Sequence, residues 1–189
     1  MNLLVKVFRK TVLFARKAFY KSLSDAKVEG SFCAVSPVLC EGRGYIKVGS
    51  KVVFGFEEDC GFWNSIAFLN PRHPESFIKI GDETRICNHF TAISEGPGIE
   101  IGSRVLIGTD VSIMDSDFHA IAPDQRIKGI PKMGRVSIAD NVWIGDHVTI
   151  LKGTVIGENS IVAAGAVVAG TYPANVVIGG IPAKVIRNI

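Results

Sequence analysis

Histidine is the side chain best suited to accept a proton near neutral pH, and the chain has four of them: His73, His89, His119 and His147. A neutral imidazole, with an unperturbed pKa of about 6.5, can take a proton from a hydroxyl group that is otherwise a poor nucleophile. His119 ends the run Asp115-Ser116-Asp117-Phe118-His119. Either aspartate could accept the second imidazole N–H and orient the ring. Alternatively, the aspartates cap turns and His119 is a solvated loop residue.

A six-residue repeat must provide the elements that position these side chains. Branched aliphatic residues recur at a spacing of six in the second half of the chain: Ile138, Ile144, Ile150, Ile156, Val162 and Val168. An α-helix would place apolar residues every three or four positions and a half-buried strand every two, so this spacing fits neither alone. It predicts a parallel β-helix in which three hexapeptides complete one coil, and each sends one aliphatic side chain inward.

Two interruptions of the repeat are expected to leave the β-helix. The period is already present in the earlier coils, with these members: Ile80, Ile86, Ala92, Ile101, Ile107 and Ile113. Residues 57–74 break it and are expected to form a loop. Residues 115–135 break it again and carry His119. Because insertions in a repeat array commonly form its binding face, the second excursion is expected to carry the site.

The first 24 residues differ in charge from the rest. They carry six lysines or arginines and no acid, so the other 165 residues have a net charge of −3 within a total of +3. At about 100° per residue, the cations and the apolar residues occupy opposite sides of a helix. The apolar side could lie on an anionic membrane surface, or pack on the body of the protein or a neighbouring subunit. We expect an all-β fold in which residues 1–27 form this helix and residues 28–189 the β-helix domain.

Composition narrows the class of protein further. The chain has 189 residues, of which 47% are hydrophobic and 20 are glycine, as is typical of a corner-rich β fold rather than a disordered chain. The four cysteines, Cys33, Cys40, Cys60 and Cys87, show no CxxC pair, and we expect buried, reduced thiols. No apolar run approaches the ~18 residues of a membrane span, and no cleavable signal peptide is evident. We expect a cytoplasmic protein, held by its basic helix at the inner face of the membrane if that helix binds lipid, and no nucleic-acid partner.

Four motifs in the last third of the chain carry a resemblance to a known family. They are NVWIG at 141–145, IGENS at 156–160, AAGAVV at 163–168 and GIPAKVIR at 180–187. With the long repeat array and the histidine-bearing excursion, they resemble the hexapeptide-repeat acyltransferases over about residues 45–189. Within that family the chain is most similar to the galactoside, maltose and nodulation-factor O-acetyltransferases and to the sugar O-acetyltransferases of bacterial polysaccharide gene clusters. The resemblance implies a left-handed β-helix, usually a homotrimer, that binds acetyl-CoA between adjacent subunits.

The resemblance also implies roles for residues that would contact the acceptor. It assigns His119 as the general base for direct transfer of an acetyl group from acetyl-CoA to a sugar hydroxyl. By register, Asn88 matches an acceptor-binding Asn with His89 as its neighbour, although Asn also suits a corner because it tolerates positive φ. Trp143 either lines the acceptor pocket or only fills the groove. The galactoside-type members lack an acid that matches Asp115 or Asp117, so that orienting role rests on chemistry alone.

Other residues are expected to bind the acetyl-CoA. The backbone N–H of Asp146 matches the family's donor to the developing oxyanion, and its carboxylate is expected to point away. Small residues would let the pantetheine approach the backbone: Ala164, Ala169 and Gly170. Relatives often carry Thr-Lys at the last two of these positions, which puts one contact in doubt. Lys184 and Arg187 match basic positions that hold the nucleotide phosphates, with a solvated tail as the alternative.

Three further functions remain open from the sequence. N-acetylation of an amino sugar would use the same acetyl-CoA groove. A noncatalytic repeat scaffold and a γ-class carbonic anhydrase share the fold, but the latter needs several histidines per zinc and only His89 and His119 are well placed. We therefore expect no metal. The basic helix favours a lipid-linked or membrane-proximal glycan, in surface polysaccharide biosynthesis, as the acceptor.

Overall fold

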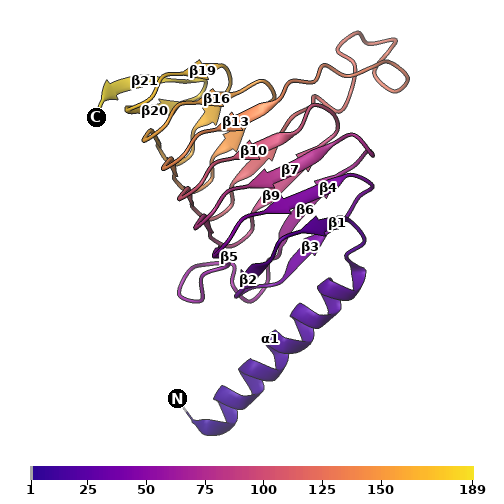
Figure 1. The fold of residues 1–189 in the computed structure, drawn as a ribbon, viewed down its shortest axis with the longest axis vertical. Coiled ribbons are helices and arrows are strands. Elements are labelled where there is room, and N and C mark those ends of the chain that lie inside the picture. Colours follow the sequence, from indigo (N-terminus) through magenta and orange to yellow (C-terminus); the bar gives the residue numbers. More distant parts are fainter. Residues whose placement is uncertain (1) are drawn as a thin grey trace.

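The structure is a computed structural model that describes residues 2–189, so Met1 of the predicted helix lies outside the described residues. One helix, α1 (Leu3–Leu23), precedes the strands, and the first of these begins at Lys27. The strands wind into a parallel β-helix of three sheets (Figure 1). The mostly-β fold predicted from the six-residue repeat is confirmed.

Successive coils contribute one strand to each of three sheets, which we name A, B and C, except that the last coil has no strand in sheet C. Sheet A contains β1 (Lys27–Glu29), β4 (Tyr45–Val48), β7 (Phe77–Ile80), β10 (Ile99–Ile101), β13 (Val136–Ile138), β16 (Val155–Ile156) and β19 (Thr171–Tyr172). Sheet B contains β2 (Phe32–Ala34), β5 (Val52–Phe54), β8 (Arg85–Ile86), β11 (Leu106–Ile107), β14 (Trp143–Ile144), β17 (Ile161–Val162), β20 (Val176–Gly180) and the antiparallel β21 (Ala183–Asn188). Sheet C contains β3 (Val38–Cys40), β6 (Ala67–Pro71), β9 (Thr91–Ser94), β12 (Ser112–Met114), β15 (Thr149–Ile150) and β18 (Val167–Val168).

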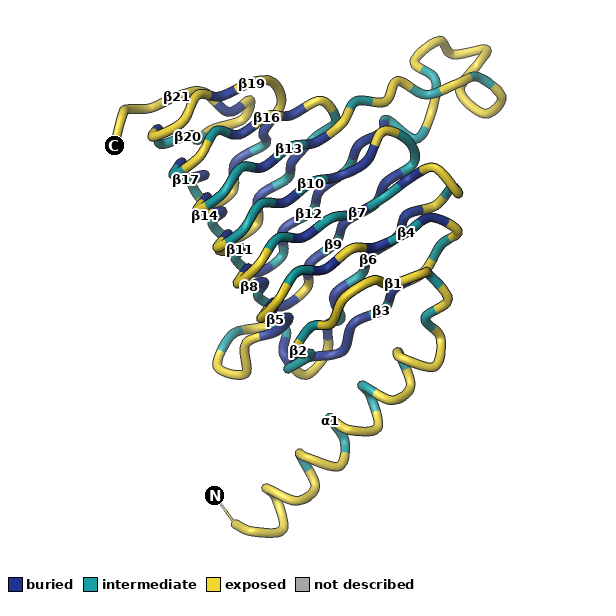
Figure 2. Tube along the Cα trace, viewed as in Figure 1, coloured by how far each residue is buried: buried dark blue, intermediate teal, exposed yellow. Residues whose placement is uncertain are grey.

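The repeated aliphatic residues form the core. Ile107 of β11 pairs in register with Ile144 of β14, and Ile113 of β12 with Ile150 of β15. All four are at most 2% exposed. Figure 2 shows the same alternation of buried and exposed positions from coil to coil. The six-residue spacing therefore stacks identical inward positions of successive coils, and their burial supplies the main stabilisation of the fold.

The corners between sheets define three edges of the β-helix: the AB, BC and CA edges, each named for the sheets it joins. A repeated hydrogen bond braces the AB and BC edges, where a side chain accepts the N–H that follows a glycine of the preceding coil. On the AB edge, Asp82 Oδ1 accepts from Ser50 N at 2.7 Å and Asp140 Oδ1 from Ser103 N at 2.9 Å. This brace recurs on the BC edge at positions where the sequence suggested function.

Two sequence predictions about local structure need correction. Residues 57–74 do not form one loop, because β6 lies within them and places Ala67 and Leu69 in the core. A two-residue alternation, rather than the hexapeptide period, identifies that strand. All four thiols are free, but Cys33 and Cys60 are exposed and only Cys40 is fully buried. Successive side chains of a strand point to opposite faces, so a cysteine in a strand can point outward as readily as inward.

Helix α1 lies beside the first coil, at the opposite end of the β-helix from the C-terminus (Figure 1). Asn2 caps its start by accepting a hydrogen bond from Leu4 N, and Ser24 follows its last turn. Cys40 N of β3 donates to Ser24 Oγ at 3.0 Å, which joins the end of α1 to sheet C. Among residues 2–189, no helix is both long enough and apolar enough to cross a membrane.

Candidate functional site

The excursion that carries His119 leaves the CA edge between β12 and β13, and Asp115 fastens its base. The side chain of Asp115 is 0% exposed. It accepts a hydrogen bond from Ser94 Oγ at 2.7 Å. It also accepts from three backbone N–H groups of the preceding coil: Glu95 at 2.7 Å, Gly96 at 3.3 Å and Gly98 at 2.9 Å. The carboxylate therefore ties the excursion to the coil below it.

Asp117 fastens the excursion to the coil above. Its carboxylate lies 2.5 Å from Lys152 Nζ, and its backbone N–H donates to Lys132 O at 3.0 Å. Lys152 was not among the predicted site residues, because the coil register rather than a sequence motif brings it to this edge. Within residues 2–189, His119 is hydrogen-bonded to neither Asp115 nor Asp117. The predicted orienting role of these aspartates thus finds no support in the contacts of one chain.

His119 is exposed, and a backbone carbonyl holds its ring. His119 Nδ1 lies 3.0 Å from Arg126 O, which closes the excursion upon itself. A carbonyl oxygen can only accept, so this hydrogen bond requires the proton on Nδ1. The neutral ring then has its lone pair on Nε2, directed away from the carbonyl and available as a base. A main-chain orienting group has no residue-type signature, which is why the sequence did not indicate Arg126.

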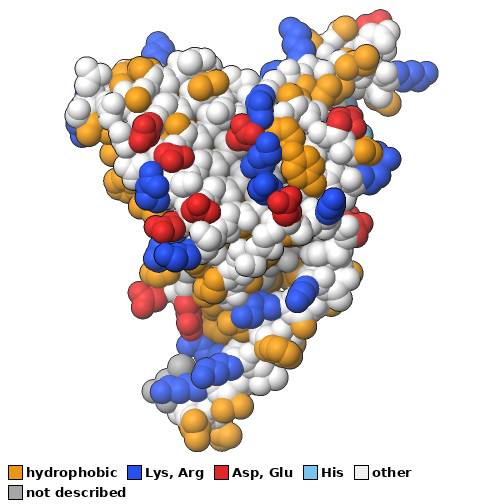
Figure 3. All heavy atoms as spheres, in the orientation of Figure 1, with side chains coloured by type: hydrophobic (Ala, Val, Ile, Leu, Met, Phe, Trp, Pro, Cys, Tyr) orange, Lys and Arg blue, Asp and Glu red, His pale blue; other side chains and the backbone are white. Residues whose placement is uncertain are grey.

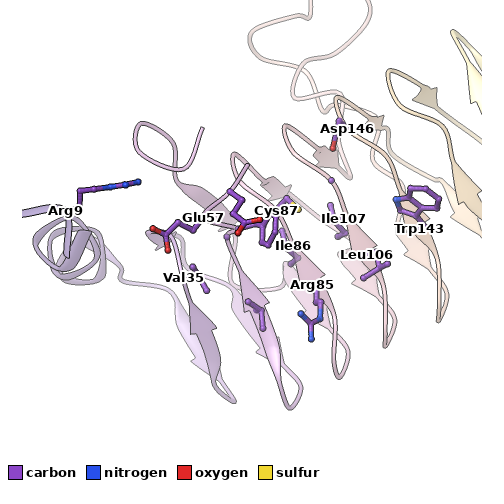
Figure 4. Close-up of a pocket in the computed structure, with 15 residues that line it drawn as sticks. Arg9, Val35, Glu57, Arg85, Ile86, Cys87, Leu106, Ile107, Trp143 and Asp146 are labelled. Carbon is purple, nitrogen blue, oxygen red and sulfur yellow. The ribbon is translucent and has the colours of Figure 1, made fainter. Parts of the chain in front are cut away.

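A groove of about 1070 Å³ crosses the outer surface of sheet B (Figure 4). It runs from Arg9 of α1 past Arg85 and Leu106 to Trp143, and Asp146 lies at its BC-edge side. The Trp143 side chain is 53% exposed, so it presents an aromatic surface rather than filling the core. An open indole beside charged side chains can stack on an apolar ring face and leave polar groups for hydrogen bonding.

Asp146 forms the repeated brace on the BC edge. Its Oδ1 accepts from Thr109 N at 2.8 Å, which turns the carboxylate towards the preceding coil. Its backbone carbonyl accepts from Gly165 N at 2.8 Å. Among residues 2–189, the backbone N–H of Asp146 donates to no other residue. That N–H is consequently available to a ligand, and the carboxylate is directed elsewhere.

Asn88 occupies the same brace position two coils earlier, and its amide is already used. Its Oδ1 accepts from Phe56 N at 3.2 Å, and its Nδ2 donates to Phe56 O at 2.8 Å and Cys60 O at 3.1 Å. The side chain is fully buried. The structure therefore gives Asn88 a clear task as anchor of the loop after β5, and its predicted contact with an acceptor finds no support in one chain.

His89, the predicted neighbour of Asn88 at the acceptor site, shares one carboxylate with His147. Asp110 Oδ1 lies 3.1 Å from His89 Nδ1 and Asp110 Oδ2 lies 3.0 Å from His147 Nδ1. All three residues are at the same BC-edge position of successive coils, with φ of 59°, 59° and 56°. Asp110 was not predicted, although it stands three residues after Ile107 just as the histidines follow Ile86 and Ile144. Within residues 2–189, no group of three such side chains has the arrangement of a metal site.

The predicted acetyl-CoA residues are divided among three places in one chain. Ala164 lies on the BC edge with Asp146, whereas Ala169 and Gly170 follow β18 on the CA edge, the edge that carries His119. Lys184 and Arg187 are exposed on β21 at the end of sheet B. Sheet C separates the BC edge from the CA edge. Within one chain, the BC-edge residues Asp146 and Ala164 therefore lie on a different edge of the β-helix from His119.

Burial raises the pKa of two cysteine thiols, Cys40 in the core and Cys87 in the lining of the groove. Burial raises the pKa of the Cys40 thiol from 9.0 to about 11. Burial, and then the nearby Asp59 and Asp146, raise the pKa of Cys87. Because the thiolate is the nucleophile, both should react more slowly than an ordinary thiol. The folded chain also keeps the Cys40 proton to higher pH than the unfolded chain, so this group lowers stability as pH rises from about 9 to 11.

We expect iodoacetamide at pH 8 to label the exposed Cys33 and Cys60 first and to reach Cys40 only after unfolding. Peptide mass spectrometry over time measures this order in the native protein and in urea. Rapid native labelling of Cys40 would contradict the packing of β3.

Comparison with known proteins agrees with this architecture. Residues 135–170 match the family model described as bacterial transferase hexapeptide (six repeats). The chain is 35% identical over 155 residues to an Escherichia coli K12 protein provisionally named lipopolysaccharide biosynthesis O-acetyl transferase WbbJ, covering 76% of this chain and 75% of that one. It is 35% identical over 121 residues to the galactoside O-acetyltransferase of the same organism, covering 61% and 59%.

A solved structure shares the fold along most of the chain. It is the hexapeptide-repeat acetyltransferase of Vibrio cholerae in complex with acetyl coenzyme A, with a TM-score of 0.56, 25% identity and coverage of 92% of this chain and 76% of that one. The chain spans less than two thirds of the length of several curated relatives, including 57% of one and 59% of the galactoside enzyme. The repeat core, the coverage of the WbbJ protein and the shared fold lead to one conclusion: this chain belongs to the hexapeptide-repeat acetyltransferase family.

Proposed function

We propose that the chain transfers an acetyl group from acetyl-CoA to a hydroxyl group of a sugar, with His119 as the general base. The observation that carries the proposal is the hydrogen bond between His119 Nδ1 and Arg126 O, because it selects the tautomer with a basic Nε2. A hydroxyl needs such a base, since an alcohol is a weak nucleophile until its proton is removed.

The reaction proceeds by direct attack. His119 Nε2 takes the hydroxyl proton as the sugar oxygen forms a bond to the thioester carbonyl carbon, and negative charge develops on the carbonyl oxygen. The tetrahedral intermediate then breaks its carbon–sulfur bond. The imidazolium gives its proton to the departing sulfur, so the products are the acetylated sugar, coenzyme A and a neutral histidine.

The backbone N–H of Asp146, which donates to no other residue among residues 2–189, is the proposed donor to the oxyanion. The exposed cations Lys184 and Arg187 are the proposed partners of the nucleotide phosphates, and the small residues beside the pantetheine are Ala164, Ala169 and Gly170. Gly165 and Gly170 leave open space where a Cβ would stand, which supports a ligand passing close to the backbone.

A complete site in this proposal needs two chains. His119 lies on the CA edge and Asp146 on the BC edge, so the base of one subunit would serve the oxyanion donor of its neighbour. A cyclic trimer with three equivalent interfaces satisfies this requirement. The sheet B groove with Trp143 is the proposed acceptor site, and the likeness to WbbJ supports a glycan of surface polysaccharide biosynthesis. The proposed location is the inner face of the membrane.

Subunit mixing tests the shared site. We expect His119→Ala alone to be nearly inactive. Asp146→Pro removes the backbone N–H, and alone it should lower kcat by roughly 10²–10³-fold. Refolding the two together at equal amounts should restore roughly a quarter of wild-type activity, because random assortment pairs an intact base with an intact N–H at that frequency.

Asp146→Ala is the matched control, because it keeps the N–H and loses only the brace to Thr109. It should retain most of the activity once its folding has been verified by circular dichroism. If the mixed sample stays inactive while both variants fold and assemble, the two-chain site is wrong.

A further inference from the structure

Helix α1 presents an uncovered apolar side to its surroundings. No residue of α1 is buried. The exposed fractions of its large apolar side chains are high: Leu4 75%, Val7 55%, Phe8 69%, Phe14 72% and Phe19 57%. At about 100° per residue these positions lie on one side of the helix. Figure 3 shows hydrophobic side chains on the surface of α1, at the end of the molecule away from the C-terminus.

The other side of α1 is fastened to the β-helix by cations. Arg16 donates to Phe62 O at 3.2 Å and to Ser65 O at 2.7 Å. Lys17 Nζ donates to Ala34 O at 3.2 Å. The Arg9 guanidinium lies 4.7 Å from the centre of the Trp63 ring. These contacts turn three of the six cations inward, so the body of the protein does not cover the apolar side.

The remaining three cations, Lys6, Lys10 and Lys21, are exposed. At about 100° per residue, Lys10 and Lys21 border the apolar side next to Phe14, and Lys6 lies farther round the helix. No acidic residue occurs from Asn2 to Ser24. An apolar side bordered by lysines matches the interface of a bilayer that contains anionic lipids. A second copy of α1 is a poorer occupant, because it would bring three more lysines and no acid to the same contact.

We infer that α1 docks the protein on an anionic lipid surface through Leu4, Val7, Phe8, Phe14 and Phe19, with Lys6, Lys10 and Lys21 at the headgroups. Arg9 belongs both to this helix and to the lining of the sheet B groove. Docking therefore holds the Arg9 end of the groove about one helix diameter from the membrane surface. If the proposed function holds, the acceptor class is a glycan linked to a lipid, and this last step rests on that function.

Vesicle binding tests the inference without turnover. The full chain is centrifuged with vesicles of phosphatidylcholine and phosphatidylglycerol at 3:1, and with phosphatidylcholine alone, at 100 mM salt. We expect binding to the anionic vesicles only. Changing Lys6, Lys10 and Lys21 to Gln should weaken it about fivefold per lysine, on the order of a hundredfold together. Phe8→Ser with Phe14→Ser should abolish it.

The matched control changes Lys27, Lys47 and Lys51 to Gln, which removes the same charge from the exposed surface of the body. It should bind as the wild type does. Equal weakening by the control, equal binding to neutral vesicles or no binding at all would overturn the inference. Unchanged vesicle binding by the Phe8/Phe14 variant together with a change in oligomeric state would identify a second copy as the occupant. Activity on a short water-soluble acceptor is measured in parallel, so that a failure of docking is distinguished from a failure of the proposed chemistry.

Discussion

Replacing His119 with alanine should lower kcat/KM for acetyl transfer by about 10²–10⁴-fold, the usual contribution of a positioned general base. The physical reason is that the variant lacks the Nε2 lone pair that accepts the proton of the sugar hydroxyl. In the wild type, the hydrogen bond from Nδ1 to Arg126 O leaves that lone pair free. Steady-state release of coenzyme A, measured with a thiol reagent against a panel of sugars, gives the change. The affinity for acetyl-CoA should be nearly unchanged, because His119 acts on the acceptor proton.

Lys128→Ala is the matched control for this variant. Lys128 lies in the same excursion and is exposed, and its backbone N–H rather than its side chain bonds to Gln125 O. The control should keep wild-type kcat/KM. Comparable losses of kcat/KM in both variants would mean that any change to the surface of the excursion lowers activity, and that His119 is not the base.

The second large effect is expected at Asp115. Asp115→Ala removes the acceptor of Ser94 Oγ and of three backbone N–H groups where the excursion leaves the CA edge. Buried donors without a partner are costly, so the free energy of unfolding should fall by roughly 2–5 kcal/mol. Urea denaturation followed by tryptophan fluorescence measures the loss. Activity should fall as well, because the excursion no longer holds His119 in one place.

Asp124→Ala provides the comparison. Asp124 is an exposed carboxylate of the same excursion, and within residues 2–189 it accepts a hydrogen bond only from its neighbour Gln125. Its removal should change the free energy of unfolding by less than about 0.5 kcal/mol. Equal stability of the two variants would show that the buried hydrogen bonds of Asp115 do not fasten the excursion.

The core of this fold is predictable from sequence because its repeat maps one residue onto one inward position. Ile138, Ile144 and Ile150 are six apart and lie on sheets A, B and C, and each is at most 2% exposed. β6 was not predicted, because its inward residues Ala67 and Leu69 follow a period of two and not the hexapeptide spacing. The excursion could be located because it interrupts the repeat, which stops at Met114 and resumes at Val136.

The site is less predictable because residue type does not show which groups are already bonded. Asn88 resembled an acceptor ligand, but its amide braces the turn at Phe56 and Cys60. Asp115 resembled a partner of His119, but its carboxylate is used by the coil below. The group that does hold the ring, Arg126 O, is a main-chain atom. Backbone hydrogen bonds of this kind depend on loop geometry, which no residue pattern encodes directly.

The chemical bond in the product shows whether the enzyme acetylates a hydroxyl group and whether His119 is needed. The full chain is incubated with isotopically labelled acetyl-CoA and a glycan acceptor, and the product is analysed by mass spectrometry before and after mild alkali. We expect a labelled acetyl ester that alkali removes, made by the wild type and absent with His119→Ala. An alkali-stable amide, or an equal yield of ester from His119→Ala, would contradict it.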